Sequence, residues 1–135
     1  MTANNATILL LDDDHDFVEM NQRVLEAAGY AVVCCYDAAE ALAKLAGGGV
    51  DLVVSDLMMK SLDAGFQFVQ QLRESPATKG LPVIMATSVS SQMGLDFTPR
   101  TAADLAAMRI DAFFDKPVPP GRLLEKVAEL LGRAH

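Results

Sequence analysis

The sequence predicts an α/β fold, in which helices cover both faces of a five-stranded parallel sheet. Short apolar segments recur along the chain, amphipathic helical patterns separate them, and 135 residues is about the size of one domain with its own core. Because the apolar segments are continuous and do not alternate with polar residues, we expect both faces of each strand to be covered. These observations predict one three-layer domain over residues 1–135.

Five segments rich in apolar, β-forming residues predict the strands. They are residues 7–11 (TILLL), 31–36 (AVVCCY), 51–55 (DLVVS), 81–87 (LPVIMAT) and 112–115 (AFFD). Strands that alternate with helices pair in parallel through right-handed crossovers. Ligands of such sheets bind beyond the carboxyl ends of the strands, so the residues that follow each strand are the candidates for function.

The segments after the first two strands predict the first two helices. Apolar residues at helical spacing predict the first: Phe17, Met20, Val24 and Ala28. Asp14 and Asp16 are expected as its cap and a first-turn acid, because negative charge is favoured at a helix N-terminus. In the second helix, over residues 37–49, Asp37 and Glu40 match a capping box and glycines end the helix.

Three further helices are predicted in the second half of the chain. Apolar residues mark them: Phe66, Val69 and Leu72 in the third, Leu105 and Met108 in the fourth, and, facing inward, Leu123, Leu124, Val127 and Leu131 in the fifth. Thr101 is the expected N-cap of the fourth helix, and Pro120 is expected at the start of the fifth. Five strands and five helices then alternate along the chain.

Composition narrows the classes of function. The 11 Lys and Arg against 18 Asp and Glu give a net charge of −7, which argues against direct binding to DNA. The only two cysteines, Cys34 and Cys35, are adjacent and are expected to be buried free thiols, not zinc ligands or a disulfide. The two histidines, His15 and His135, are expected to be solvated and to have no role. No apolar stretch approaches the length that spans a membrane, and the start MTANNAT does not resemble a secretory signal, so we expect a cytoplasmic location.

Polar residues stand where the predicted strands end. Asp12 and Asp13 follow the first strand, Asp56 the third, Thr87 ends the fourth, and Lys116 follows the fifth. Three carboxylates brought together repel, so they either raise a pKa or recruit a cation, and oxygen ligands favour a hard ion such as Mg²⁺. With an ammonium and a hydroxyl nearby, Asp56 is a candidate nucleophile that forms an aspartyl phosphate.

Four segments, ILLLDDD, DLVVSDLMM, PVIMATS and FFDKPV, closely resemble in this order the receiver domain of two-component response regulators. The resemblance covers essentially the whole chain. It implies a flavodoxin-like, doubly wound sheet with strand order 2-1-3-4-5. Within the domain we expect a flexible N-terminus over residues 1–6. We also expect residues 88–101, between the fourth strand and the fourth helix, to form a loop that is longer than is usual in the family.

The resemblance assigns a role to each polar residue at the strand ends. Asp56 matches the phosphoacceptor, and Asp13 matches the direct ligand of Mg²⁺, for which Mn²⁺ substitutes. Asp12 matches the acid that reaches the ion through water, and the backbone carbonyl of Met58 matches a third protein ligand. Lys116 matches the lysine that contacts the phosphoryl oxygens.

The family also implies a switch and a set of partners. Thr87 and Phe113 match the switch pair, in which the hydroxyl moves toward the phosphate and the aromatic ring follows. The face formed by the fourth helix, the fifth strand and the fifth helix then changes and is a candidate dimer interface. The donor would be a sensor histidine kinase or a phosphotransfer protein, and the chain would be a stand-alone signalling phosphoprotein, not an enzyme, acting on a downstream protein.

The sequence departs from the family pattern in several places. Lys60 stands where most receivers have proline, residues 63–65 lengthen the next turn, and Arg109 stands where glycine commonly ends the fourth helix. The 88–101 loop is either an ordered lid or partner-binding loop, or a passive surface insertion. The side chains of Met58 and Val89, which flank the path of water in the family, are apolar, so we expect slow self-dephosphorylation.

Other functions stay open at this point. A receiver-like module could bind a partner through the 88–101 loop without being phosphorylated. A phosphatase of the haloacid dehalogenase type would need a second acid at Met58, and a nucleotide-binding flavodoxin-like protein would need a glycine-rich loop after the first strand, where acids stand instead. Asp56 could also simply cap a turn, and Phe113 could simply be a core residue.

Overall fold

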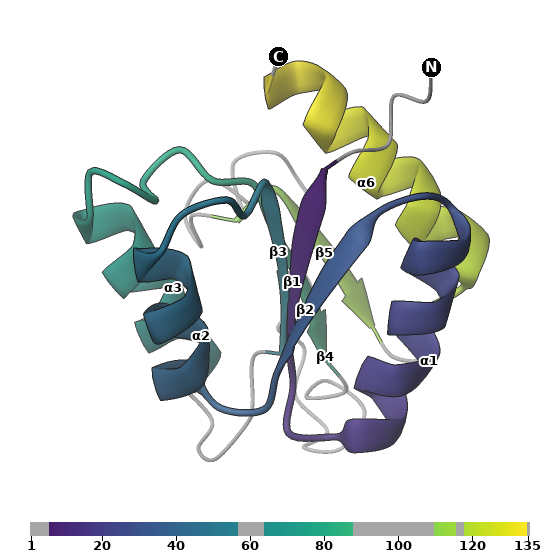
Figure 1. Ribbon diagram of the computed structural model, residues 1–135, viewed down its shortest axis with the longest axis horizontal. Coiled ribbons are helices and arrows are strands. Elements are labelled where there is room, and N and C mark those ends of the chain that lie inside the picture. The colour runs from purple at the N-terminus through teal and green to yellow at the C-terminus, as the bar shows by residue number, and fades with distance from the viewer. Residues whose placement is uncertain (1–5, 57–63, 88–109, 116–117, 135) are drawn as a thin grey trace.

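The computed structural model describes residues 6–56, 64–87, 110–115 and 118–134. Five parallel strands form one sheet in the order β2-β1-β3-β4-β5 (Figure 1). The strands are β1 (Thr7–Leu11), β2 (Ala31–Cys35), β3 (Leu52–Ser55), β4 (Val83–Thr87) and β5 (Ala112–Asp115). The predicted fold class and strand order are confirmed, and the predicted strand ends are correct to within two residues.

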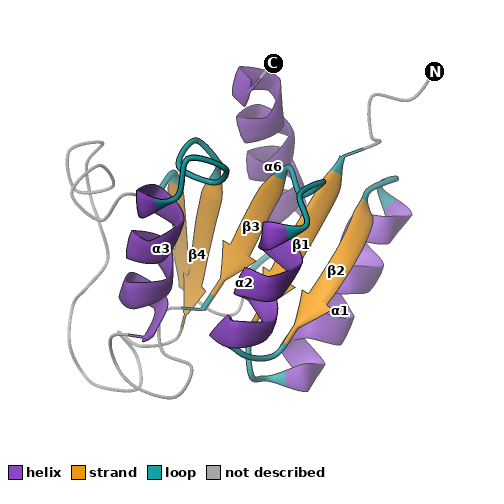
Figure 2. Cartoon of the chain, turned by 60° about the vertical axis from the view of Figure 1, so that its left-hand side comes forward, coloured by secondary structure: helices purple, strands orange, loops and turns teal. Residues whose placement is uncertain are grey.

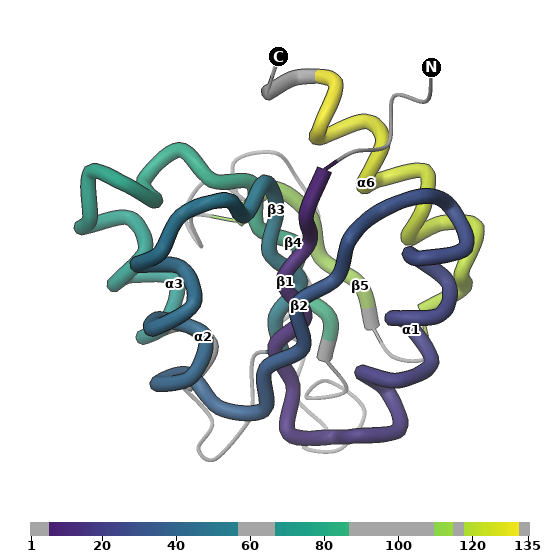
Figure 3. Tube along the Cα trace, in the orientation of Figure 1, coloured from purple at the N-terminus to yellow at the C-terminus, as the bar shows by residue number. Residues whose placement is uncertain are grey.

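Four helices lie in the described part of the chain and form the outer two layers. They are α1 (His15–Ala27), α2 (Ala38–Ala46), α3 (Ala64–Glu74) and α6 (Pro120–Ala134). Helices α1 and α6 cover one face of the sheet, and α2 and α3 cover the other (Figure 2). The helix predicted from Thr101 onward lies outside the described residues. The trace in Figure 3 shows that β1 begins and α6 ends at the same edge of the sheet, away from the carboxyl ends of the strands.

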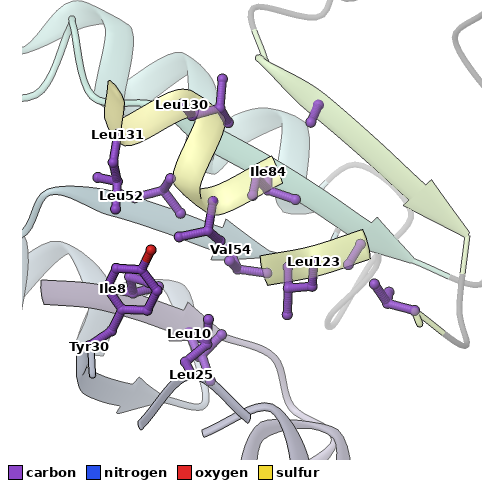
Figure 4. Close-up of a cluster of buried hydrophobic side chains, with 14 of the residues drawn as sticks. Ile8, Leu10, Leu25, Tyr30, Leu52, Val54, Ile84, Leu123, Leu130 and Leu131 are labelled. Carbon is purple, nitrogen blue, oxygen red and sulfur yellow. The ribbon is translucent and has the colours of Figure 1, made fainter. Parts of the chain in front are cut away.

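The alternation of side chains along each strand divides the core into two clusters. Ile8 and Leu10 of β1 face α1 and α6, whereas Leu9 and Leu11 face α2 and α3. In the first cluster, sheet residues lie against leucines of α6, as Figure 4 shows for Leu52, Val54, Ile84, Leu123, Leu130 and Leu131. All four residues of β3 are buried, so this central strand is covered on both sides as predicted.

Helix α1 is confirmed, but the apolar residues that predicted it are not all on its buried face. Met20 is 47% exposed and is the only large hydrophobic residue that is exposed in the described part of the chain. The face that packs on the sheet runs through Phe17, Val18, Asn21 and Leu25. The polar residue Asn21 therefore lies at a core position. Hydrophobicity alone favours the neighbouring stripe, which runs through Met20.

The N-terminal cap of α2 uses the predicted residues, but one of its two hydrogen bonds differs from that of a capping box. The Asp37 carboxylate accepts from the N–H of Glu40 at 2.8 Å, as in a capping box. The Glu40 carboxylate, however, accepts from the N–H of Tyr36 at 2.9 Å, one residue before the N-cap. At the other end of α2, Gly48 and Gly49 have φ values of 76° and 86°, which glycine adopts without a steric cost.

Candidate functional site

Two acids extend the sheet at the carboxyl ends of its central strands. Asp12 follows β1, and its N–H donates to the carbonyl of Cys35 at 3.2 Å; Asp56 follows β3, and its N–H donates to the carbonyl of Leu11 at 3.0 Å. Both backbones thus continue the ladder of hydrogen bonds between strands. The two residues are also buried, with 1% of Asp12 and 6% of Asp56 exposed. The sheet itself holds these acids in place.

Asp13 completes a cluster of three carboxylates at this edge. One oxygen from each of Asp12, Asp13 and Asp56 lies within 4.8 Å of the other two, and Asp13 is the exposed member. Three negative charges at this spacing repel one another, most strongly where burial lowers the effective dielectric constant. Carboxylate oxygens are the ligands that hard divalent cations prefer, so the donor set fits Mg²⁺.

The turn after β1 separates the acids of this region into two groups. The N–H of Asp14 donates to Asp12 Oδ1 at 2.9 Å. The Asp14 side chain is the N-cap of α1 and accepts from the N–H groups of Asp16 and Phe17 at 3.1 and 3.3 Å. The predicted roles of Asp14 as a cap and of Asp16 as a first-turn acid are confirmed, and neither residue belongs to the acidic cluster.

Of the other predicted site residues, the structure describes Thr87 and Phe113. Thr87 is the last residue of β4 and pairs in register with Asp115 of β5. Lys116 and Met58 lie outside the described residues, so their predicted contacts stay predictions. Phe113 is half-buried in β5, opposite Met85, and packs with the core cluster on the side of α2 and α3. The structure therefore brings the three acids together and brings Thr87 to the same edge of the sheet.

An aromatic pair that the sequence did not predict lies at the same edge of the sheet. The rings of His15 and Tyr36 stack with centroids 4.0 Å apart and an angle of 7° between their planes. His15 is exposed, as expected, but it also makes this specific contact with another side chain. Burial is the main cause that raises the pKa of Tyr36. Nearby groups that carry or acquire negative charge, such as Cys34 and Glu19, raise it further. The hydroxyl therefore stays protonated at neutral pH.

The two cysteines are free thiols on β2, as predicted. Cys35 is fully buried, and Cys34 is partly buried on the opposite face of the strand. Burial, together with the Glu40 carboxylate, raises the pKa of Cys35 to about 11. Burial also raises the pKa of Cys34. Neither thiol is suited to act as a nucleophile at neutral pH.

No helix in the described part of the chain is long and apolar enough to cross a membrane.

The family model described as "Response regulator receiver domain" matches residues 8–128. The chain is 32% identical over 131 residues to the alkaline phosphatase synthesis transcriptional regulatory protein PhoP of Bacillus subtilis, covering 97% of this chain and 50% of that protein. It is 34% identical over 132 residues to the response regulator Rre1 of Synechocystis, covering 97% of this chain and 54% of that protein.

The chain thus spans about half the length of the two relatives just described. Among solved structures, the chemotaxis response regulator CheY4 of Vibrio cholerae superposes with a TM-score of 0.78 at 28% sequence identity. That match covers 94% of this chain and 99% of CheY4. Family model, relatives and solved structure agree on one family.

Proposed function

The chain belongs to the response regulator receiver family, and on this premise we propose that it accepts a phosphoryl group on Asp56 in a two-component pathway. The observation that carries the proposal is the cluster of Asp12, Asp13 and Asp56 at the carboxyl edge of the sheet. The backbone of Asp56 is held by a ladder hydrogen bond at the end of a fully buried strand, and the residue itself is buried, so its carboxylate starts from a fixed point at the edge of the sheet. A fixed carboxylate beside a cation site has the elements that phosphoryl transfer to an acid requires.

In the proposed reaction, one carboxylate oxygen of Asp56 attacks the phosphorus of a phosphohistidine on a sensor kinase or phosphotransfer protein. The new O–P bond forms as the P–N bond breaks, and the imidazole nitrogen takes the bonding electron pair. The ring leaves neutral because its other nitrogen carries a proton. The product on Asp56 is a mixed anhydride of a carboxylic and a phosphoric acid, so the chain acts as a signalling phosphoprotein that assists its own modification.

The cation would be held by Asp12, Asp13, Asp56 and the backbone carbonyl of Met58. When bound, Mg²⁺ or Mn²⁺ neutralises negative charge on the phosphoryl oxygens. Lys116 would contribute a second positive charge. The carboxylates' own part is to hold the ion beside Asp56, and the burial of Asp12 supports this role because a buried, hydrogen-bonded acid keeps its position.

We infer that Thr87 and Phe113 relay phosphorylation to the surface. Their strands are neighbours in register, and Phe113 lies opposite Met85, two residues before Thr87. Movement of the Thr87 hydroxyl toward a phosphoryl group would leave space for the half-buried ring of Phe113. The surface that includes β5 and α6 would then change shape, bind a downstream protein and pair with a second copy of the chain.

Intact-mass spectrometry after treatment with acetyl phosphate and Mg²⁺ tests the proposal. We expect one added phosphoryl group on the wild-type chain and none on Asp56→Asn. Asp16→Asn is the matched control, since it removes one acid near the site but outside the acidic cluster, and it should be modified like the wild type. An unmodified wild-type chain would instead favour a receiver-like module that binds a partner through residues 88–101, which lie outside the described residues.

A further inference from the structure

The His15–Tyr36 stack joins the two turns that flank the acidic cluster on one side. His15 is the first residue of α1, two positions after Asp13, and Tyr36 directly follows β2. The two strands are paired in register, with Leu11 opposite Cys35, so the chain leaves both strands at the same level of the sheet. A parallel stack at 4.0 Å is therefore a tertiary contact between these two turns.

Tyr36 is anchored by the backbone around it. Its N–H donates to the Glu40 carboxylate at 2.9 Å, and the N–H of Glu40 donates to the Asp37 cap at 2.8 Å. The carbonyl of Cys35, the preceding residue, accepts the N–H of Asp12. The backbone at Tyr36 is therefore held by α2 through Glu40 and lies next to the bond that Cys35 makes with Asp12. The partly buried ring packs against the core cluster and stacks on His15.

Asp13 lacks such support from hydrogen bonds. Asp12 is buried and its carboxylate accepts the N–H of Asp14, and Asp56 is buried with its backbone held by a ladder bond, whereas Asp13 is exposed. Within the described part of the chain, no hydrogen bond or ion pair holds its side chain. The position of Asp13 thus depends on the backbone of the turn from Asp12 to His15. The hydrogen bonds of Asp14 hold that turn from within, and the stack adds a tertiary contact at its end, at His15.

We propose that the His15–Tyr36 stack positions Asp13 for the cation, so that it tunes the affinity of the acidic cluster for Mg²⁺. The inference rests on the proposed function, since it concerns the same cluster. Both rings are positioning groups that act through Asp13. Without the stack, the turn also adopts conformations in which the Asp13 carboxylate points away from Asp12 and Asp56. Only a fraction of the molecules can then bind the ion, so the apparent affinity for Mg²⁺ falls by that fraction.

The measurement is the dissociation constant of Mg²⁺ alone, obtained by calorimetric titration of the full chain without phosphoryl donor. Tyr36→Ala and His15→Ala should each weaken binding by about 2- to 10-fold, the factor that corresponds to the stacking energy of one aromatic pair. Tyr36→Phe keeps the ring and should stay within about twofold of the wild type. The double variant should be no weaker than the weaker single variant, because the two changes remove the same contact.

Met20→Ala serves as the control for α1, because Met20 is exposed on that helix and is not part of the stack. It should leave the Mg²⁺ dissociation constant unchanged. Thermal unfolding of each variant in EDTA separates positioning from a purely structural role. A Tyr36→Ala protein that unfolds earlier but binds Mg²⁺ as tightly as the wild type would overturn the inference, and so would additive losses in the double variant. A wild-type chain that binds no Mg²⁺ would overturn the proposed metal site as well, so the two failures are distinguishable.

Discussion

Asp13→Asn tests whether charge repulsion within the acidic cluster lowers the stability of the metal-free chain. The substitution keeps the size of the side chain and removes one of three negative charges that lie within 4.8 Å of one another. In the absence of a divalent ion, Asp13 repels both Asp12 and Asp56, and both repulsions disappear in the variant. We therefore expect the metal-free variant to be more stable than the metal-free wild type.

The size of the gain follows from the spacing. Two unit charges at 4.8 Å repel by about 0.9 kcal/mol at the dielectric constant of water and by about 3.5 kcal/mol at an effective value of 20. Asp13 is exposed, so each of its two repulsions lies near the lower value. Part of the repulsion persists in the unfolded chain, because Asp12 is adjacent in sequence. A gain of about 1–2 kcal/mol, or roughly 3–8 °C in Tm for a domain of this size, is expected.

The assay is thermal unfolding in EDTA and in Mg²⁺, for the wild type and for Asp13→Asn. Mg²⁺ at ten times its dissociation constant should stabilise the wild type by about 1.4 kcal/mol and the variant by clearly less, because the variant lacks the carboxylate that we propose as a ligand. Asp16→Asn is the control, since it removes the same charge from the first turn of α1, outside the cluster. It should be slightly destabilising by loss of a favourable helix-terminus charge. A metal-free Asp13→Asn protein no more stable than the wild type would refute the reasoning.

Three further outcomes are expected. Asn21→Leu should raise the free energy of unfolding by about 1 kcal/mol in urea titrations, because the buried Oδ1 of Asn21 has no hydrogen-bond partner among the residues that the structure describes; a loss of stability would contradict this. Cys35, followed in a Cys34→Ala background, should react with a thiol reagent at pH 8 about a hundredfold more slowly than in urea, since its pKa is raised from 9.0 to about 11; equal rates would count against burial of the thiol. Once Asp56 is phosphorylated, Met58→Asn should shorten the lifetime of the phosphoryl group at least about tenfold, measured by loss of the mass adduct, because an amide can orient water; an unchanged lifetime would show that Met58 does not limit hydrolysis.

The elements that are well predicted from sequence are those that local pattern determines. Continuous apolar runs indicate the strands, and parallel strands end at one edge of their sheet, so the positions of Asp12, Asp13 and Asp56 in the chain are enough to predict that they meet. The stack of His15 on Tyr36 could not be predicted in this way. It joins residues 21 positions apart, and it depends on the register of β1 against β2 and on the direction of two turns.

The buried face of α1 does not follow from hydrophobicity alone. Two stripes on this helix differ by one position, and hydrophobicity alone favours the stripe through Met20 over the one through Asn21. The fold instead buries Val18 and Leu25 and accepts a polar residue between them, whose amide donates to the carbonyl of Phe17 at 2.8 Å. Tertiary packing thus outweighed the local pattern, because the more hydrophobic stripe was not the one that fits the sheet.

The burial of β3 keeps Asp56 close to Asp12 and Asp13. Val53 and Val54 are covered on opposite faces, so the strand cannot shift to move Asp56 away from Asp12 and Asp13. Repulsion among the three acids therefore cannot relax through the backbone of β3. Of the three acids, only Asp13 is exposed. If the cluster binds a cation as proposed, changes in the turn that carries Asp13 can alter its affinity without disturbing the core.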